Sequence, residues 1–320
     1  MKFVVAGIDI GGTNSAFGIV DQDGKFYGEG SIPTRAYAKF DEWASAMHSA
    51  IMNVLEPHKN EIKLVGIGIG APNGNYYSGC IENAVNLSWD GNVPAVAKLK
   101  ELFGEDKAVV LTNDANAAAV GEMVYGGAKG MKDFIVVTLG TGLGGGVVVN
   151  GQVVYGLDGN AGELGHIIAE KGGRACGCGR NGCLETYVSA TGIKRTVFEL
   201  LATENIPSLL RDISFNDLTS EMIYKAAVKN DEIALKAFDF TGKILGQALA
   251  DFAAFSTPEA FFLFGGLAKS GEFILEPTIR YMEENICFIY KDKIKVLLSD
   301  LNDKNAAVLG AAALAWSSKN

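Results

Sequence analysis

Positive charge is scarce in this sequence. Its 28 lysine and arginine residues stand against 37 acidic residues, so the chain of 320 residues carries a net charge of -9. Proteins that hold nucleic acid or an anionic membrane surface by electrostatics need basic patches. The balance therefore excludes a general nucleic-acid binder and an electrostatic membrane anchor, and we expect neither partner.

Long hydrophobic runs are also missing, because no stretch approaches the roughly 20 apolar residues of a membrane-spanning helix. The N-terminus, MKFVVAGIDIGG, has a charge and an apolar run, but Asp9 interrupts the run ahead of a glycine turn. No cleavage-like site follows, so the segment predicts a first β-strand and not a signal peptide. We expect a cytoplasmic protein.

Cysteine is rare and unevenly placed. Three of the five cysteines, Cys176, Cys178 and Cys183, fall within the segment CGCGRNGCLE. They could form a disulfide, a redox-active pair or a metal site, and disulfides are uncommon in reducing compartments. His166 lies ten residues before Cys176 and would complete the four-ligand set of a zinc site. We predict that these four residues bind Zn²⁺, with a CxC redox pair as the alternative.

Such a zinc site would be structural. Three thiolates and one imidazole fill a tetrahedral shell and leave no open position for water. Cys80 and Cys287 have no partner motif, so we expect both to be buried as small hydrophobic residues. His48 and His58 lie in or just after a polar-faced helix, where we expect solvated side chains.

Glycine, in contrast, is abundant, with 40 residues and no collagen-like period. It is therefore expected in tight turns and where the backbone approaches a ligand closely. Three glycine loops follow buried strand-like runs: GIDIGGTNSAF, VVTLGTGLGGG and FFLFGGLAKSG. Backbone N–H groups of such turns can converge on a phosphate, although glycine can also serve only to make a tight hairpin. None of the loops matches the Walker pattern or a dinucleotide fingerprint.

Apolar periodicity predicts an alternation of strands and helices along the chain. Strands are expected within 4–10, 15–21, 25–32, 63–72, 107–115, 134–156, 258–264 and 293–299, and helices within 41–58, 93–104, 116–126, 186–256, 272–286 and 306–318. Residues 134–156 repeat the strand, glycine loop and strand pattern of the N-terminus. A shift of 129 residues places Gly11 on Gly140 and Gly18–Val20 on Val147–Val149. We predict two related α/β halves.

The motifs DIGGTN, TLGTGLGGG and LFGG together resemble the superfamily of sugar kinases, actin and Hsp70. AGELGH followed by CGCGRNGCLE resembles one branch of it, the ROK family of repressors, uncharacterised reading frames and sugar kinases, over essentially the whole chain. Within the family the pattern is closest to the bacterial glucokinases. The resemblance implies a two-domain α/β fold of the actin-like ATPase (ribonuclease H-like) type, with a ligand cleft between the domains. We expect a small domain over 1–115 plus 304–320 and a large domain over 116–303 that carries the zinc loop.

The resemblance also implies ATP and Mg²⁺ at the glycine loops. The residues expected to bind them are Asp9, Gly11, Gly12, Thr13, Asn14, Thr141, Gly142, Gly265 and Gly266. Asp9 ends the first strand, where its carboxylate could hold Mg²⁺ through water. Asn14 departs from the lysine that many members carry, which would weaken contact with a transferring phosphate.

Asn113 and Asp114 stand at a strand-to-helix junction in LTNDANAAAVGE. An aspartate there most often caps the helix. The resemblance instead implies that Asp114 is the general base that accepts the proton of a sugar hydroxyl, and that Asn113 holds a neighbouring hydroxyl. The further sugar contacts that it implies are Asn73, Asn86, Glu163, His166 and Glu185, although an isolated glutamate is more often a solvated surface charge.

The activity implied is transfer of the γ-phosphoryl group of ATP to the 6-hydroxyl of a hexose, with glucose as the first candidate. The resemblance further implies a cytoplasmic homodimer that acts in carbohydrate metabolism (glycolysis). Kinases for N-acetylmannosamine, N-acetylglucosamine, allose and fructose share most of these motifs. A sugar-responsive repressor would carry a helix-turn-helix segment ahead of the DIGGT strand, which here begins at residue 3. A non-catalytic sugar-binding scaffold is disfavoured by the intact Asp114 and the three complete glycine loops.

Overall fold

The computed structural model describes residues 1–84, 86–301 and 306–318, which form two compact units. Unit 1 is Met1–Met131, Val153–Ala161 and the described part of Asp300–Asn320, and unit 2 is Lys132–Gln152 and Gly162–Ser299. No helix within the described ranges combines the length and the apolar character that crossing a membrane requires.

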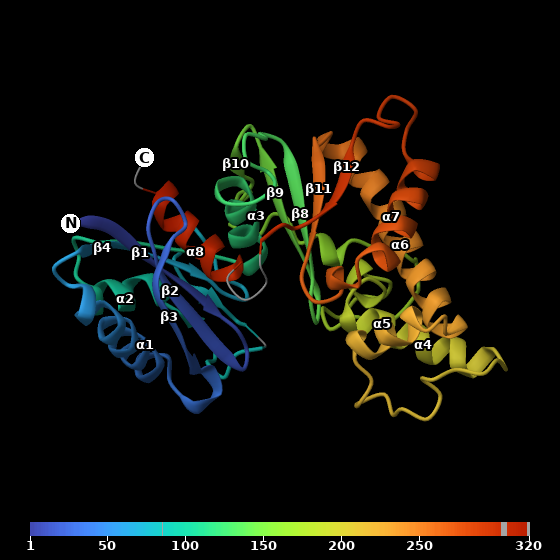
Figure 1. The fold of residues 1–320 in the computed structure, drawn as a ribbon, viewed down its shortest axis with the longest axis horizontal. Helices are drawn as coiled ribbons and strands as arrows, with labels where there is room; N and C mark the ends of the chain where they lie inside the picture. The colour runs from blue at the N-terminus through green and yellow to red at the C-terminus, as the bar shows by residue number, and fades with distance from the viewer. Residues whose placement is uncertain (85, 302–305, 319–320) are drawn as a thin grey trace. The chain divides into compact units, whose positions relative to one another are not determined.

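Unit 1 is built on a five-stranded sheet in the order β3-β2-β1-β4-β7 (Figure 1). Its strands are β1 (Lys2–Ile10), β2 (Asn14–Val20), β3 (Phe26–Pro33), β4 (Ile62–Gly70) and β7 (Ala108–Thr112). The first three form an antiparallel meander, whereas β4 and β7 are parallel to β1. A short antiparallel ribbon joins β5 (Ile81–Glu82) to β6 (Asn92–Val93).

The helices of unit 1 are α1 (Phe40–Leu55), α2 (Ala95–Phe103), α3 (Asp114–Val124) and α8 (Ala306–Ser317). In α1, Trp43, Met47 and Ile51 recur at helical spacing and are fully buried in the core. As predicted, α1 ends before Pro57, and Gly104 is the C-cap of α2.

The alanine-rich helix α8 lies close against β1 and β4 because glycine lines the facing strands. A Cβ atom on Gly7 would lie 2.1 Å from the carbonyl oxygen of Val308, and one on Gly68 would lie 1.7 Å from that of Ala311. These two positions therefore require glycine for the helix to pack on the sheet.

Unit 2 repeats this architecture with a five-stranded sheet in the order β10-β9-β8-β11-β12. Its strands are β8 (Phe134–Leu139), β9 (Leu143–Val149), β10 (Gln152–Val153), β11 (Ala260–Phe264) and β12 (Lys295–Leu298). The helices are α4 (Ala190–Thr203), α5 (Ser220–Val228), α6 (Glu232–Ser256) and α7 (Glu272–Asn285). The longest of them, α6, packs against α7 and α4.

The two sheets have the same strand order, and in both the central strand is antiparallel to its hairpin partner and parallel to the next strand, which agrees with the predicted pair of related halves. The predicted residue match is wrong by one position after the turn. Gly7 pairs with Gly18 across the first hairpin, and the equivalent Val136 pairs with Gly146 across the second. Gly18 therefore corresponds to Gly146 and not to the start of Val147–Val149, because the second turn is one residue shorter.

The division into units differs from the boundary expected at residue 115. Unit 1 continues to Met131 because α3 packs on α8 and β4. The contact is tight, since a Cβ atom on Gly310 would lie 2.3 Å from the carbonyl oxygen of Ala117. The C-terminal helix α8 belongs to unit 1.

A second difference is that Val153–Ala161 belongs to unit 1 and not to the large domain. Asn75 holds this segment, because its Nδ2 donates to the carbonyl oxygen of Asp158 at 2.7 Å. The rings of Tyr76 and Tyr155 stack with centroids 4.1 Å apart. No sequence motif marks Asn75, so this connection was not predicted.

Candidate active site and metal centre

The carboxyl ends of three parallel strands of unit 1 meet at one edge of the sheet. Asp9 of β1 pairs with Gly70 of β4, and Gly70 pairs with Thr112 of β7. Asn113 and Asp114 follow β7 directly. Because carboxyl ends of parallel strands carry the loops that bind ligands in α/β proteins, this edge is the candidate catalytic site of unit 1.

Asn113, and not Asp114, is the N-cap of α3. Its Oδ1 accepts a hydrogen bond from the N–H of Asn116 at 2.7 Å, which leaves Nδ2 of Asn113 as a donor. Asp114 occupies the first turn of the helix, and its Oδ1 accepts from the N–H of Ala115 at 2.9 Å. No side chain in the described part of the chain donates to the Asp114 carboxylate. The helix is therefore capped without using Asp114, which stays available for another role.

The two carboxyl groups at this edge are both shifted toward the protonated form. Burial raises the pKa of Asp9 to about 6, with the negative charge of Asp114 as the second cause. Although the Asp114 residue is exposed, loss of hydration in the surrounding protein raises its pKa, and hydrogen bonds from backbone N–H groups oppose that rise. A raised pKa makes a carboxylate a stronger base. Neither carboxylate has an ion-pair partner among the described residues. Two such carboxylates at one edge are suitable ligands for a divalent cation.

The glycine turn between β1 and β2 lies at the same edge. The N–H of Gly11 closes the turn on the carbonyl oxygen of Asn14 at 3.1 Å. The N–H groups of Gly12 and Thr13 have no acceptor within the described ranges. A Cβ atom on Gly12 would lie 2.8 Å from the backbone oxygen of Asn86. The turn thus presents free N–H groups, as an anion-binding turn does.

The equivalent turn of unit 2 contacts Glu185. The N–H of Gly140 closes this turn on the carbonyl oxygen of Gly142 at 3.0 Å. The N–H of Leu143 then donates to Oε2 of Glu185 at 3.0 Å, and a Cβ atom on Gly142 would lie 2.2 Å from the same oxygen. The structure therefore joins a residue expected to bind sugar to a loop expected to bind phosphate.

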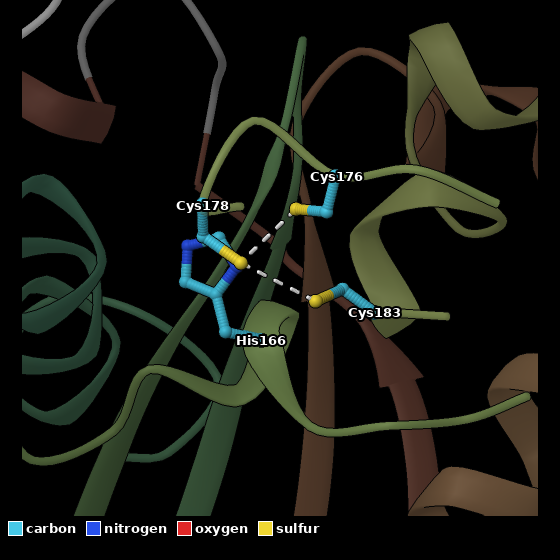
Figure 2. A group of neighbouring side chains, drawn as sticks. All are labelled: His166, Cys176, Cys178 and Cys183. Carbon is cyan, nitrogen blue, oxygen red and sulfur yellow. Dashed lines mark hydrogen bonds between the residues drawn. The ribbon is translucent and has the colours of Figure 1, made fainter. Parts of the chain in front are cut away.

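Four side chains of unit 2 converge as the sequence predicted (Figure 2). The ligand atoms of His166, Cys176, Cys178 and Cys183 all lie within 4.8 Å of one another. Sγ of Cys176 lies 3.7 Å from Nδ1 of His166, and Sγ of Cys178 lies 3.5 Å from Sγ of Cys183. In a tetrahedral zinc site, bonds of about 2.3 Å to sulfur and about 2.0 Å to nitrogen put ligand atoms roughly 3.5–3.8 Å apart. The cluster fits Zn²⁺, and since Nδ1 faces the sulfur atoms, Nε2 of His166 is left for another contact.

The loop that carries these ligands is folded by short bridges and glycines. Ile168 pairs with Cys183, and Ala175 pairs with Asn181. The N–H and guanidinium groups of Arg180 lower the pKa of Cys178 to about 6, whereas burial raises the pKa of Cys183. Zinc deprotonates the thiols that coordinate it. Binding of the metal would therefore convert the buried Cys183 thiol to a thiolate.

Arg174 holds the loop of the His166–Cys183 cluster to the rest of unit 2, and no sequence motif marks this residue. Its Nη1 donates to the carbonyl oxygen of Thr186 at 2.8 Å, and its Nε donates to Glu199 of α4 at 2.9 Å. The guanidinium carbon lies 4.4 Å from the centroid of the Tyr187 ring. One largely buried side chain, 10% exposed, therefore connects the loop, the turn after Cys183 and α4.

Replacing Arg174 by methionine keeps a side chain over the Tyr187 ring but removes the hydrogen bonds. We expect the free energy of unfolding to fall by about 2–4 kcal/mol, because buried acceptors lose a charged donor. Urea denaturation followed by circular dichroism measures the change. The matched control is Arg280→Met, which breaks an exposed pair with Asp239 and should cost less than about 1 kcal/mol. Equal losses in the two variants would contradict the anchoring role.

The remaining predicted residues lie on the surface of their units. Asn73, with φ 52°, donates from Nδ2 to the carbonyl oxygen of Glu82 at 2.9 Å. Glu163 is exposed and precedes the 3₁₀ turn η3 (Leu164–His166). The side chains or backbones of Thr13, Asn14, Asn86, Thr141 and Gly266 are exposed as well. Gly265 has φ 102°, and a Cβ atom there would lie 2.8 Å from the carbonyl oxygen of Leu139.

The predicted residues thus form one set in each unit. The set in unit 1 comprises Asp9, Gly11, Gly12, Thr13, Asn14, Asn73, Asn86, Asn113 and Asp114. The set in unit 2 comprises Thr141, Gly142, Glu163, His166, Cys176, Cys178, Cys183, Glu185, Gly265 and Gly266.

Two predictions about residues outside the site are wrong. Cys80 is only half-buried and Cys287 is exposed, because each lies in a loop and not in a core-facing element; Cys287 follows the last turn of α7. His48 is partly buried against the ring of Phe103, with centroids 4.7 Å apart, and this burial lowers its pKa. It faces the neighbouring helix α2 and is not fully solvated.

Comparison with known proteins gives a consistent result. A model of the ROK family matches residues 5–318. The glucokinase of Halalkalibacterium halodurans is 35% identical, over 98% of this chain and 95% of the relative. The N-acetylmannosamine kinase of Escherichia fergusonii is 30% identical, over 98% of each chain. The crystal structure of a ROK family glucokinase from Streptomyces griseus, in complex with glucose and AMPPNP, matches with a TM-score of 0.80 and 32% identity, over 98% of this chain and 99% of that one. The predicted two-domain α/β fold of the actin-like ATPase type is confirmed.

Proposed function

The chain belongs to the ROK family, and from that premise we propose that it is an ATP-dependent hexose kinase that phosphorylates the 6-hydroxyl of glucose. Support comes from glucokinases that are 31–35% identical over nearly the whole chain and from the likeness to a glucokinase bound to glucose and AMPPNP. The observation that carries the proposal is the edge of unit 1, where the Asp114 carboxylate, which does not cap α3, lies at the same end of the sheet as a turn with free N–H groups.

Asp114 is proposed as the general base. Phosphoryl transfer depends mainly on positioning and on charge stabilisation, with one carboxylate accepting the proton of the attacking hydroxyl. The raised pKa of Asp114 suits this task, since the carboxylate binds the proton more tightly. Nδ2 of Asn113 is free to donate to a neighbouring hydroxyl, because its Oδ1 is occupied by the helix cap.

The phosphates of ATP are assigned to the glycine turns. Free N–H groups of Gly12 and Thr13 would receive phosphate oxygens, and the shorter turn at Thr141 and Gly142 serves the same purpose in unit 2. Asp9 would hold Mg²⁺ through water, which fits a buried carboxylate that has no cation partner among the described residues. Mg²⁺, when bound, neutralises charge on the phosphates.

The zinc loop is proposed to bind the sugar and not to react with it. Zn²⁺ held by His166 and the three cysteines would fix the loop that carries Glu163 and Glu185. With Nδ1 directed to the metal, Nε2 of His166 can donate to a sugar hydroxyl. Asn73 and Asn86 are assigned as additional sugar contacts. The working protein is proposed to be a cytoplasmic homodimer of carbohydrate metabolism.

A coupled assay of ADP release over a panel of hexoses and N-acetylhexosamines tests the substrate. Glucose should give the highest kcat/KM. N-acetylmannosamine is the second candidate, because a kinase for it is 30% identical over 98% of this chain. A higher kcat/KM for any other sugar would replace glucose as the substrate, and no turnover with any sugar would refute the kinase assignment.

Replacing Gly142 by alanine should weaken sugar binding through Glu185. The new Cβ atom would lie 2.2 Å from Oε2 of Glu185, so the carboxylate must leave the turn. We expect KM for glucose to rise about tenfold, the value of one lost charged hydrogen bond. The matched control is Gly177→Ala on the zinc loop, where a Cβ atom would meet nothing within 4 Å. An unchanged KM in Gly142→Ala would show that Glu185 does not bind the sugar.

A further inference from the structure

The glycine turn of unit 1 contains no positively charged side chain. Its residues, Gly11–Asn14, carry no positive side chain, and the carboxylates of Asp9 and Asp114 stand at the same edge of the sheet. A phosphoryl group that moves from ATP to a sugar develops charge that enzymes stabilise with arginine, lysine or metal ions. Backbone N–H groups supply only partial charges. A positive side chain near this turn would therefore have a clear task.

Arg35 lies at this turn. It belongs to η1 (Thr34–Ala36), the 3₁₀ turn that follows β3. Because β3 runs antiparallel to β2, the end of β3 lies beside the start of β2, where Asn14 pairs with Pro33. The glycine turn and η1 are separated in sequence, but they lie at the same edge of the sheet.

Three hydrogen bonds fasten η1 to the glycine turn. The N–H of Thr34 donates to the carbonyl oxygen of Thr13 at 2.8 Å, and its Oγ1 donates to that of Gly11 at 2.7 Å. Nε of Arg35 donates to the carbonyl oxygen of Gly12 at 3.0 Å. The buried hydroxyl of Ser15, 2.7 Å from Oγ1 of Thr34, supports the contact from the interior. The guanidinium is therefore held on the turn and does not swing freely in solvent.

Both Nη groups of Arg35 remain available. The chain has six arginines, and each of the other five donates through at least one Nη group to a protein acceptor; these are Arg174, Arg180, Arg195, Arg211 and Arg280. Within the described residues, Arg35 is tethered through Nε alone, and its side chain is exposed. A planar guanidinium with two free N–H₂ groups matches the oxygens of a phosphoryl group.

We propose that Arg35 is a phosphate-binding residue that contacts the phosphoryl group transferred at the turn Gly11–Asn14. The inference rests on the proposed kinase function and adds a residue to it. The ligand is a terminal phosphoryl group, which belongs to ATP before transfer and to the hexose 6-phosphate afterwards. The carbonyl of Gly12 orients the guanidinium, and the two Nη groups neutralise the phosphoryl oxygens.

The test removes the charge at position 35 and restores it from position 14. Arg35→Ala should lower kcat/KM for ATP about 10- to 100-fold, the range for a lost hydrogen bond to a charged group. Directly opposed residues on paired strands have Cβ atoms about 4.5–5.5 Å apart, so a lysine at Asn14 starts beside Pro33 and reaches the same turn. The double variant R35A/N14K should regain most of the lost kcat/KM.

The control is Lys39→Ala, an exposed cation at the N-cap of α1, which should leave kcat/KM for ATP within about twofold because exposed charges contribute little. The thermal midpoint should stay unchanged in every variant. An unchanged kcat/KM in Arg35→Ala would overturn the proposal. So would a loss that N14K does not restore, because then Arg35 would act only as a tether of η1.

Two further measurements separate the source of the phosphoryl group. A weaker product inhibition by glucose 6-phosphate in Arg35→Ala assigns the contact to the sugar phosphate, and a selective rise in KM for ATP assigns it to the γ-phosphate. Calorimetric titration with MgATP, without sugar, keeps the inference independent of the sugar assignment. A weaker affinity of Arg35→Ala supports the phosphate contact even if glucose is not the substrate, and equal MgATP affinity together with equal product inhibition would refute it.

Discussion

Replacing Asp114 by asparagine is expected to lower kcat for glucose phosphorylation about 1,000-fold while glucose still binds. A positioned general base contributes on the order of 10²–10⁴ to the rate. Asparagine keeps the size of the side chain and can still accept from the N–H of Ala115, as Asp114 does at 2.9 Å. It cannot accept the proton of the attacking hydroxyl. Because α3 is capped by Asn113, the fold should be unaffected.

Steady-state kinetics and calorimetric titration with glucose measure the two effects separately. The matched control is Asp106→Asn, which neutralises an exposed aspartate in the turn before β7 and should leave kcat unchanged. For the unmodified protein, kcat should fall as pH falls through the raised pKa of Asp114, since the protonated carboxyl cannot act as a base. If Asp114→Asn kept more than a tenth of kcat, another residue would have to be the base.

The second large effect is expected at the zinc cluster. Cys183→Ala removes the fully buried ligand of the four, and three remaining ligands do not close a tetrahedral shell. Bound zinc should fall from one ion per chain to nearly none. Binding of a structural zinc ion contributes directly to folding, so the thermal midpoint should fall by about 10 °C or more. Glucose affinity should fall with it, because Glu185 follows Cys183 by two residues.

Metal analysis, a thermal melt and glucose titration measure these three results. The control is Cys287→Ala, an exposed cysteine after α7, which should keep its zinc and its midpoint. Chelators should act slowly on the unmodified protein, since four protein ligands would hold the metal and one of them, Cys183, is fully buried. Instant and fully reversible inhibition by a chelator would instead indicate a catalytic metal, and full zinc content in Cys183→Ala would refute the ligand assignment.

Regular elements and the metal cluster were predictable because their signals are local. The helical spacing of Trp43, Met47 and Ile51 predicted α1, and the duplicated hairpin predicted two related α/β halves, which agrees with the common strand order of the two sheets. The convergence of His166, Cys176, Cys178 and Cys183 could be predicted from one short segment without knowledge of the fold. The sequence also predicted that Asp114 lies at a strand-to-helix junction, and it does, at the start of α3 after β7.

Contacts that depend on tertiary structure were not predictable. Nothing near Arg174 in the sequence shows that its guanidinium reaches Thr186 and Glu199. The boundary after α3 depends on how closely α8 packs, which follows from glycines on different segments. Asn113 and not Asp114 caps α3, because the helix already begins at Asp114 and the N-cap position therefore falls on Asn113. Such contacts are set by the tertiary structure and not by residues that are neighbours in sequence.

The central claim is that this chain transfers the γ-phosphoryl group of ATP to the 6-hydroxyl of glucose. Phosphorus NMR of the purified protein with MgATP and glucose tests it most directly, because it identifies the product. Glucose 6-phosphate and ADP should appear in equal amounts as ATP disappears, and the variant Asp114→Asn should give neither. Appearance of ADP with inorganic phosphate and no sugar phosphate, or an unchanged ATP spectrum at saturating glucose, would contradict the claim.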